Sequence, residues 1–478
     1  MKALKNFSIY LLSSLFQSAS NFFLIPIYIR YLTPSEYGVI NIILVFSSIL
    51  SLISNLGVES GFYRLYYDGP KEDLLATTIL WRFFSGFLFF ILIFIFSHKL
   101  SYLLFKSTNY YIAIIYSGIF LFIFPIKELF FLILRLEQEA KRFFYWTLIF
   151  TFFDFGLKFI WIVILKKGVN GFWLAHTLSY VIIIPIIFLY FPIFSLFKRP
   201  NLFLLKNILK IGFPYTFSSL GNWIVTSSDK LLLNFFIGSS SVGVYTLAIK
   251  ISAIYNVVLR TPVQLWFGPF ALEKASKFGI EVFRNTIKKI LNIIIFLGIL
   301  LIPIITLLGL LIGFLPSYEE YKKAIPIVPF CIIPLLLENV MSVFGIQFIQ
   351  AKKTKYAGIG GISASFISLL FNFLFIPFIG IYGAIISSIV TYSIWLVIYF
   401  IGGQKSIYIK YEVNKFIKSI ILLISYELMI IIIFVLSKNF YLPFFVVSMI
   451  FVFVIIILNY KSIFPYIKEA LSIIRGYI

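Results

Sequence analysis

The residues best suited to chemistry lie between Asn222 and Lys250, where charges interrupt hydrophobic sequence. Asp229 and Lys230 are neighbours, and Lys250 follows the short polar turn Gly238–Ser241. Charged side chains are costly in hydrocarbon and usually face a bundle interior or a watery cavity. Cations held there can bind an anionic group, because charge-assisted hydrogen bonds to phosphate oxygens are strong.

The composition indicates which elements must position these residues. Of the 478 residues, 61% are hydrophobic and only 12% are charged, and the mean hydropathy is +1.03. Soluble proteins carry roughly twice that share of charge. Apolar runs of about 20 residues, long enough to cross a bilayer as a helix, recur from end to end. We therefore expect an all-α polytopic membrane protein with about 14 transmembrane helices.

The expected helices are separated by short polar or charged loops. Their spans are 7–32, 37–61, 74–97, 110–134, 143–165, 171–197, 207–237, 243–268, 285–313, 322–350, 356–378, 380–400, 413–436 and 440–459. The remaining segment 461–478 is too short and too charged to span. It is expected to be a cytoplasmic tail, either solvated or amphipathic at the membrane surface.

Cysteine, histidine and net charge exclude several classes of protein. A single cysteine, Cys331, excludes a disulfide framework and a thiolate metal cluster. His98 and His176 form no ligand motif, so neither a metal nor a cofactor is expected. The net charge of +22 would suggest nucleic acid in a soluble protein. Here it fits loops that meet anionic lipid, and no nucleic-acid partner is expected.

Loop charge predicts the orientation. With the N-terminus in the cytoplasm, most of the 40 Lys and Arg residues fall in cytoplasmic segments. The opposite loops hold only Arg30, Lys99, Lys106, Lys166, Lys167, Lys322, Lys323 and Lys438. Basic loops stay inside, so both termini are expected to be cytoplasmic.

An internal repeat predicts two related lobes. Several small residues recur at an offset of 205 residues: Ser13, Ser14, Ser35 and Gly38 correspond to Ser218, Ser219, Ser240 and Gly243. Two more recur at an offset of 212, Gly168 and Gly171 as Gly380 and Gly383. Both copies start on the same side, so the repeat is parallel, as in transporters that rock two lobes around a central site. The expected lobes are 1–200 and 201–405, followed by two helices in 406–460.

Four segments form a recognisable pattern. They are the motif YLTPSEYG at Tyr31–Gly38, the motifs around Ser228-Asp229-Lys230 and Val242–Tyr245, and the loop Leu134–Phe143. Together they resemble motifs of the polysaccharide flippases in the multidrug, oligosaccharidyl-lipid and polysaccharide exporter superfamily. The resemblance covers nearly the whole chain, and in that family the turn motifs mostly hold the fold.

The resemblance implies a function as well as a V-shaped pair of lobes like that of the multidrug exporters. A flippase moves a polyprenyl-pyrophosphate-linked oligosaccharide from the inner to the outer leaflet of the cytoplasmic (inner) membrane. It does so by alternating access, and the oligosaccharide is used for surface polysaccharides such as O-antigen. The resemblance therefore implies a transporter and not an enzyme. The expected partners are this substrate and membrane lipids, with a polysaccharide polymerase and a chain-length regulator beside them.

The candidate substrate-binding residues are charged or polar groups within or near the spans. Lys250 and Asp229 are expected at similar depth on consecutive helices. Lys250 would meet the pyrophosphate or sugar and Asp229 would hold it between cycles, the alternative being a structural ion pair. The other candidates are Lys230, Arg82, Arg30, Arg260, Asn222 and Ser218. Snorkelling is the alternative for Arg82, and membrane anchoring for Arg30 and Arg260.

Three residues are candidates for ion coupling. Asp154 and Lys158 are four residues apart on one expected helix and so share a face. They are either a site for a coupling cation or proton, or a pair that neutralises itself. Glu338 is a lone acid within an expected span, with Asn339 beside it.

Two other function classes remain open. A multidrug exporter of the same superfamily would favour an acidic, aromatic cavity, whereas the charge excess within the expected spans is basic. A membrane glycosyltransferase or polymerase would need a substantial extramembrane loop or paired catalytic groups, and the sequence shows neither.

The loop charges make the topology testable. Reporter fusions after Lys210 should read as cytoplasmic, and fusions at Ser240 should read as external, because the positive-inside rule places these loops on opposite sides. Paired alkaline phosphatase and green fluorescent protein fusions would measure this. A cytoplasmic reading at Ser240 would contradict the two-lobe prediction.

Overall fold

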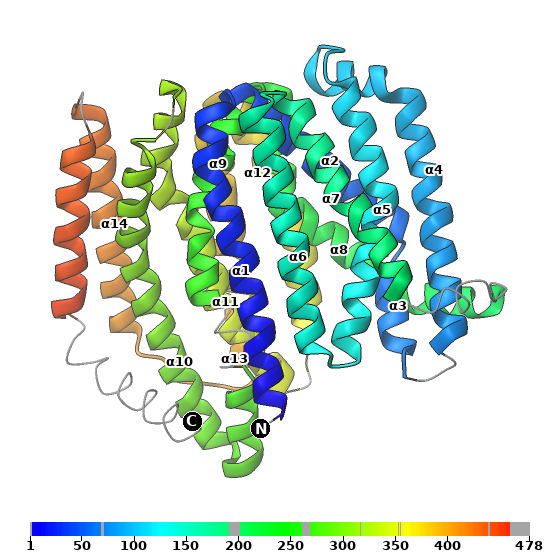
Figure 1. Ribbon diagram of the computed structural model, residues 1–478. Coiled ribbons are helices and arrows are strands. Elements are labelled where there is room, and N and C mark those ends of the chain that lie inside the picture. Colours follow the sequence, from blue (N-terminus) through cyan, green and yellow to red (C-terminus); the bar gives the residue numbers. More distant parts are fainter. Residues whose placement is uncertain are drawn as a thin grey trace. The chain divides into compact units, whose positions relative to one another are not determined.

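The computed structural model describes residues 2–67, 71–190, 201–260, 268–315, 317–351, 353, 355–437 and 440–458. Every labelled element is a helix (Figure 1). The α-helices are α1 Lys2–Tyr31, α2 Pro34–Asn55, α3 Val58–Leu65, α4 Lys71–Phe105, α5 Tyr111–Leu136, α6 Ala140–Phe159, α7 Gly168–Tyr190, α8 Leu202–Phe236, α9 Ser239–Ser252, α10 Gly268–Ile312, α11 Val328–Gln350, α12 Lys355–Ile379, α13 Ile381–Ser406 and α14 Val413–Leu436. Shorter elements are η1 Ile160–Ile164, η3 Asn256–Arg260 and η5 Glu319–Ile327, and a final unlabelled helix spans Tyr441–Leu458.

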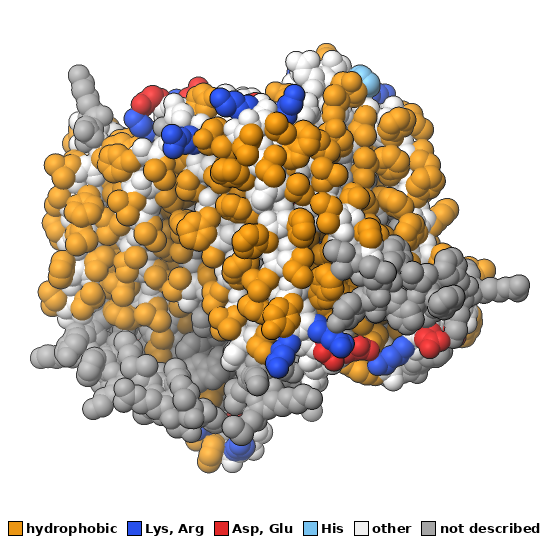
Figure 2. Space-filling model, viewed as in Figure 1, with side chains coloured by type: hydrophobic (Ala, Val, Ile, Leu, Met, Phe, Trp, Pro, Cys, Tyr) orange, Lys and Arg blue, Asp and Glu red, His pale blue; other side chains and the backbone are white. Residues whose placement is uncertain are grey.

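The helices are those of a multi-pass membrane protein. In the described ranges, 11 helices are long and apolar enough to cross a membrane. The other three expected spans, 110–134, 171–197 and 207–237, overlap in sequence with α5, α7 and α8, and residues 191–197 lie outside the described ranges. On the face shown in Figure 2, hydrophobic side chains cover the length of the helices and charges gather near their ends. The all-α polytopic fold is therefore confirmed, whereas the count of 14 stays a prediction, and the tail 461–478 lies outside the described residues.

Among the helices that differ in extent from the expected spans, three show a local cause. The expected helix 37–61 ends as α2 at Asn55, because Leu56 and Gly57 adopt left-handed conformations with φ of 46° and 73°. The expected helix 285–313 begins earlier, as α10, and is broken at Gly279, where φ is 83°. The expected helix 322–350 is divided into the 3₁₀ helix η5 and α11, whose first turn contains a proline, a position where no backbone donor is needed.

Contacts divide the chain into two compact units, Met1–Gly243 and Val244–Ile478. In the first unit α5 packs between α4 and α7, and α1 packs against α6. In the second unit α13 packs against both α11 and α12, and α10 packs against α11. These units are defined by contacts between residues and not by the sequence repeat. The lobe boundaries at 200, 405 and 460 therefore remain predictions.

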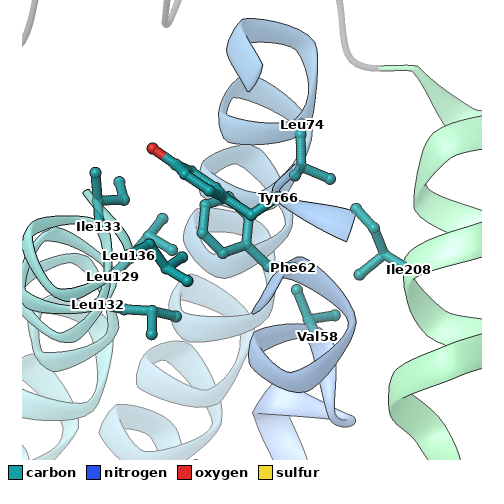
Figure 3. Packing of buried hydrophobic residues seen from close by; sticks show 9 residues of the cluster. All are labelled: Val58, Phe62, Tyr66, Leu74, Leu129, Leu132, Ile133, Leu136 and Ile208. Carbon is teal, nitrogen blue, oxygen red and sulfur yellow. The ribbon is translucent and has the colours of Figure 1, made fainter. Parts of the chain in front are cut away.

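Within the first unit, a buried apolar cluster packs the short helix α3 against α4, α5 and α8 (Figure 3). It joins residues of α3, its C-terminal cap, α4, α5 and α8, namely Val58, Phe62, Tyr66, Leu74, Leu129, Leu132, Ile133, Leu136 and Ile208. At its edge Tyr66 donates a hydrogen bond to Glu137 at 2.8 Å. Burial and this carboxylate raise the pKa of the Tyr66 hydroxyl, so it stays protonated and remains the donor.

The motif at Tyr31–Gly38 forms the start of α2. The Thr33 hydroxyl accepts a hydrogen bond from the Glu36 backbone at 3.1 Å, and the Glu36 carboxylate accepts one from the Thr33 backbone at 2.9 Å. This reciprocal pair is a capping box, and Pro34 occupies the first turn beside it. These residues therefore stabilise the helix terminus.

Residues related by the internal repeat contact each other at the start of α2. A Cβ added at Gly38 would lie 1.8 Å from the carbonyl oxygen of Ser239, and one at Gly243 would lie 1.9 Å from that of Pro34. Pro34 and Gly38 correspond to Ser239 and Gly243 in the repeat, so one contact is made twice. In membranes, small residues let helix backbones approach closely. The first turns of α2 and α9 therefore meet backbone to backbone.

Gly38→Ala and Gly243→Ala should each lower the melting temperature and the yield of folded protein. The added methyl group would meet a backbone carbonyl that cannot move away, and overpacking typically costs about 1–3 kcal/mol. Thermal unfolding in detergent, followed by size-exclusion chromatography, would measure the change.

Gly156→Ala in α6 is the matched control, because nothing lies within 4 Å of a Cβ added there. Alanine favours a helix interior over glycine by about 1 kcal/mol, so this variant should melt at or above the temperature of the wild type. Equal melting of Gly38→Ala and Gly156→Ala would contradict the close contact.

Candidate substrate and ion-coupling sites

A buried polar cluster lies where α6 meets α7. Asp154 on α6 has its Oδ2 atom 2.6 Å from Lys158 Nζ. Its Oδ1 atom lies 3.1 Å from His176 Nδ1 and accepts a hydrogen bond from Ser179 at 3.2 Å. Lys158 and Ser179 are buried, whereas Asp154 and His176 are half-buried. The predicted pair of Asp154 and Lys158 is thus present, with two further partners from α7.

Aromatic rings surround this cluster. Lys158 Nζ lies 4.9 Å from the ring centroid of Phe172, a cation–π distance. The His176 ring packs against Phe120 at 4.9 Å and Tyr180 at 5.2 Å between centroids. Such surroundings strengthen the ion pair and penalise an unpaired charge. Asp154 is already compensated, so a further cation could bind only if Lys158 or His176 moved away.

The sequence pattern assigns no role to His176 or Ser179. One signal for His176 is available nonetheless. Helices α6 and α7 follow each other with a short connection, and Asp154 and His176 lie at similar distances along the chain from it. At about 1.5 Å of rise per residue they are therefore at similar depth.

A bidentate ion pair lies in the second unit. Arg260, the last residue of η3, contacts Glu338 of α11 with Nη2–Oε1 at 2.7 Å and Nη1–Oε2 at 3.0 Å. This fork geometry is among the strongest forms of carboxylate pairing. The acid expected to be alone in its span and the arginine expected near a helix end are therefore partners.

Two further cations of the first unit are buried beside acids. Arg82 of α4 is 4% exposed, and its Nη2 atom lies 3.3 Å from Glu59 Oε2 of α3. Its guanidinium does not extend to the surface, which argues against snorkelling. Lys127 of α5 lies 2.8 Å from Glu128 and 4.4 Å from the centroid of the Phe131 ring. Arg30, at the end of α1, is exposed.

The charged residues between Asn222 and Lys250 lie on α8 and α9. Asp229 is buried, and its Oδ1 atom accepts a hydrogen bond from the Lys230 backbone at 2.8 Å and lies 3.4 Å from Lys230 Nζ. Lys230 also donates to the Thr226 carbonyl at 3.2 Å. Lys250 is half-buried near the end of α9. Asp229 belongs to the first compact unit and Lys250 to the second, and their pairing stays a prediction.

Both repeat-related helices α1 and α8 carry exposed polar side chains. On α8, Ser218, Asn222 and Thr226 are exposed and spaced by four residues, so they lie on one face. On α1, Gln17 and Asn21 are exposed, and they correspond to Asn222 and Thr226 at the repeat offset of 205. Hydroxyl and amide groups both donate and accept hydrogen bonds, which suits sugar hydroxyls.

A metal site is not found within the described ranges: no three His, Cys, Asp or Glu side chains there are grouped to hold an ion. Cys331 is buried.

Comparison with known proteins identifies the family. The family described as polysaccharide biosynthesis protein matches residues 3–270, which is more than half of the chain. The chain belongs to this family. No curated protein matches the sequence.

Solved structures show the fold of this polysaccharide biosynthesis family member. The lipid II flippase MurJ in an inward closed conformation is 15% identical with a TM-score of 0.72, covering 96% of this chain and 99% of that one. An inward-facing MATE family multidrug transporter is 19% identical with a TM-score of 0.65, over 81% and 94% of the two chains. An outward-facing MATE transporter is 17% identical with a TM-score of 0.59, over 84% and 95%. The fold is thus one found in flippases and transporters.

Lys158→Met should destabilise the protein, because it leaves the Asp154 charge without its ammonium partner. Breaking a buried ion pair costs about 3–5 kcal/mol. The double variant Asp154→Asn/Lys158→Met removes both charges and should recover much of the lost melting temperature. Melting temperatures in detergent would measure both.

Lys277→Met is the control. Lys277 pairs with Glu273 at 2.6 Å, but both side chains are exposed, and such pairs contribute about 0–1 kcal/mol. If the losses of the two single variants simply add in the double variant, Asp154 and Lys158 are not energetically coupled.

Proposed function

We propose that this protein moves a polyprenyl-pyrophosphate-linked oligosaccharide from the inner to the outer leaflet of the cytoplasmic membrane, for assembly of a surface polysaccharide. The observation that carries the proposal is membership of a polysaccharide biosynthesis family combined with a fold shared with a lipid II flippase over 96% of the chain. A sugar head group on a lipid is a cargo that agrees with both comparisons.

The chemistry of this cargo explains the buried cations. A diphosphate that leaves water needs Lys or Arg, because charge-assisted hydrogen bonds must replace its hydration. We assign Lys250 as the head-group contact and Asp229 as the acid that holds it between cycles. Lys230, Arg82, Arg30 and Arg260 supply further positive charge. Asn222 and Ser218 are exposed on α8 and suit the sugar hydroxyls.

Coupling to an ion requires an acid whose partners can change. Asp154 with Lys158 and His176, and Glu338 with Arg260, are the two candidates. A proton or cation bound at Asp154 would weaken its hold on Lys158 and on α7. The packing of α6 on α7 would then have two states, and a ligand can shift an equilibrium only by binding those states differently.

A multidrug exporter is the second candidate, favoured by the fold shared with the MATE transporters. A cationic drug needs an acid that is free to bind it. Asp154, Asp229 and Glu338 each contact Lys or Arg. Carboxylates that are compensated in this way favour an anionic cargo. A glycosyltransferase or polymerase is not proposed, because the fold is one of transporters and flippases.

Lys250→Ala should abolish or strongly reduce surface glycan while leaving the protein in the membrane at near-normal level. Lys250→Arg should keep more activity, since the charge survives although its geometry differs. Surface glycan in a strain that depends on this gene, together with an immunoblot of the membrane fraction, would measure both effects. Lys277→Ala, at an exposed position, is the control and should export normally.

The double variant Asp229→Ala/Lys250→Ala separates substrate contact from a structural pair. Asp229→Ala alone should reduce both abundance and export, because Lys250, which we propose that Asp229 compensates, would be left unpaired at a cost of about 3–5 kcal/mol. If the double variant regains the export that each single variant lost, Lys250 is a structural partner only and the assignment is overturned.

Purified protein in proteoliposomes distinguishes the two cargo classes. A fluorescent polyprenyl-pyrophosphate disaccharide should cross the bilayer faster with the protein than without it, in a Lys250-dependent manner. Transport of ethidium instead of this lipid would support the exporter.

A further inference from the structure

A cavity of about 790 Å³ opens on the second unit, among α10, η5 and the final helix. Three candidate membrane spans, Phe270–Ile312, Glu319–Gln350 and Tyr441–Leu458, begin or end here. The ends of spans lie where hydrocarbon meets the lipid head groups. The cavity is therefore at interfacial depth, and its volume is that of a small-molecule site.

The walls of the cavity are apolar and face outward. Leu311, Phe314 and Leu442 are 63%, 70% and 71% exposed. An exposed apolar surface of this kind marks an interaction site in a soluble protein. In a membrane-spanning unit the same surface contacts lipid chains.

Local packing fixes the aromatic wall of the cavity. The Tyr441 hydroxyl donates a hydrogen bond to the Gly313 carbonyl at 3.1 Å. The Tyr441 ring stacks on Phe440 at 4.6 Å and packs against Phe314 at 4.8 Å between centroids. A Cβ at Gly313 would lie 3.1 Å from the Tyr441 ring, so the glycine permits this contact. The aromatic wall is thus preformed.

The mouth of the cavity carries one cation and one anion. Lys322 Nζ lies 2.5 Å from Glu319 Oε1, and the two side chains are 35% and 84% exposed. Both residues belong to η5 and line the cavity. The Lys322 ammonium and the Glu319 carboxylate are electrostatically complementary to a ligand that carries a phosphate next to an ammonium.

We propose that this cavity binds a phospholipid with a zwitterionic ethanolamine head group. The acyl chain lies along Leu311, Phe314 and Leu442, the phosphate contacts Lys322, and the lipid ammonium contacts Glu319. Ethanolamine has N–H donors for the carboxylate, whereas choline has none. The phosphoglycerol head group has no cation, so it would bring an anion next to Glu319. The bound lipid is distinct from the transported cargo.

Native mass spectrometry of the full-length protein tests this proposal. Delipidated protein in detergent would be given dioleoyl phosphatidylethanolamine, phosphatidylcholine or phosphatidylglycerol, one at a time. One phosphatidylethanolamine should be retained with about fivefold higher affinity than the other two lipids, as expected for a partly exposed charge-assisted contact.

Two variants and a matched pair of controls locate the site. Glu319→Gln should remove the preference for ethanolamine over choline, and Lys322→Gln should weaken binding of all three phospholipids. Glu273→Gln and Lys277→Gln alter an ion pair of 2.6 Å on α10 outside the cavity and should change nothing. Leu311→Trp fills the apolar wall and should reduce retention of every phospholipid, with gel filtration confirming that the variant is folded.

Three results would overturn the proposal. They are equal retention of the three lipids, a preference that Glu319→Gln and Lys322→Gln leave intact, and displacement of phosphatidylethanolamine by an equal concentration of polyprenyl phosphate. The last result would make the cavity part of the cargo path. Lipid binding and export fail independently, because Lys250→Ala should still retain phosphatidylethanolamine.

Discussion

The requirement that a charge buried in a membrane protein be compensated governs much of this structure. Arg82 contacts Glu59, Lys158 contacts Asp154, and Arg260 contacts Glu338. These contacts also connect elements: α4 to α3, and η3 to α11, while Asp154 reaches α7 through His176. The pairs that make the charges tolerable therefore also position the helices. A chain that keeps cations buried in a membrane has to keep acids beside them.

Compensation of this kind also suits a transport cycle. A phosphate and a carboxylate make similar charge-assisted hydrogen bonds to Lys and Arg. In the transport cycle that we propose, an arriving diphosphate would therefore replace a carboxylate at a cation, and the carboxylate would return when the cargo leaves. No step then leaves a bare charge in a low-dielectric site, so binding need not be so tight that it prevents release.

The features that could be predicted from the sequence are those that depend on one helix at a time. Bilayer thickness imposes apolar runs of about 20 residues, and the spacing of Asp154 and Lys158 makes them neighbours on any α-helix. The contacts of Asp154 with His176 and of Arg260 with Glu338 depend on how two helices are rotated about their axes, which depth alone does not determine. The end of α2 at Leu56 could not be predicted from the sequence either, because leucine rarely adopts a left-handed conformation.

The doubled glycine contact between α2 and α9 has an implication for how such a chain arises. Pro34 and Gly38 meet Ser239 and Gly243, which are their own counterparts. A two-fold axis produces this kind of self-complementary contact. If the two repeats were separate polypeptides, the same four positions would form an isologous interface between identical subunits. On this interpretation of the repeat, joining the copies into one chain preserves that interface and lets each half acquire its own charges.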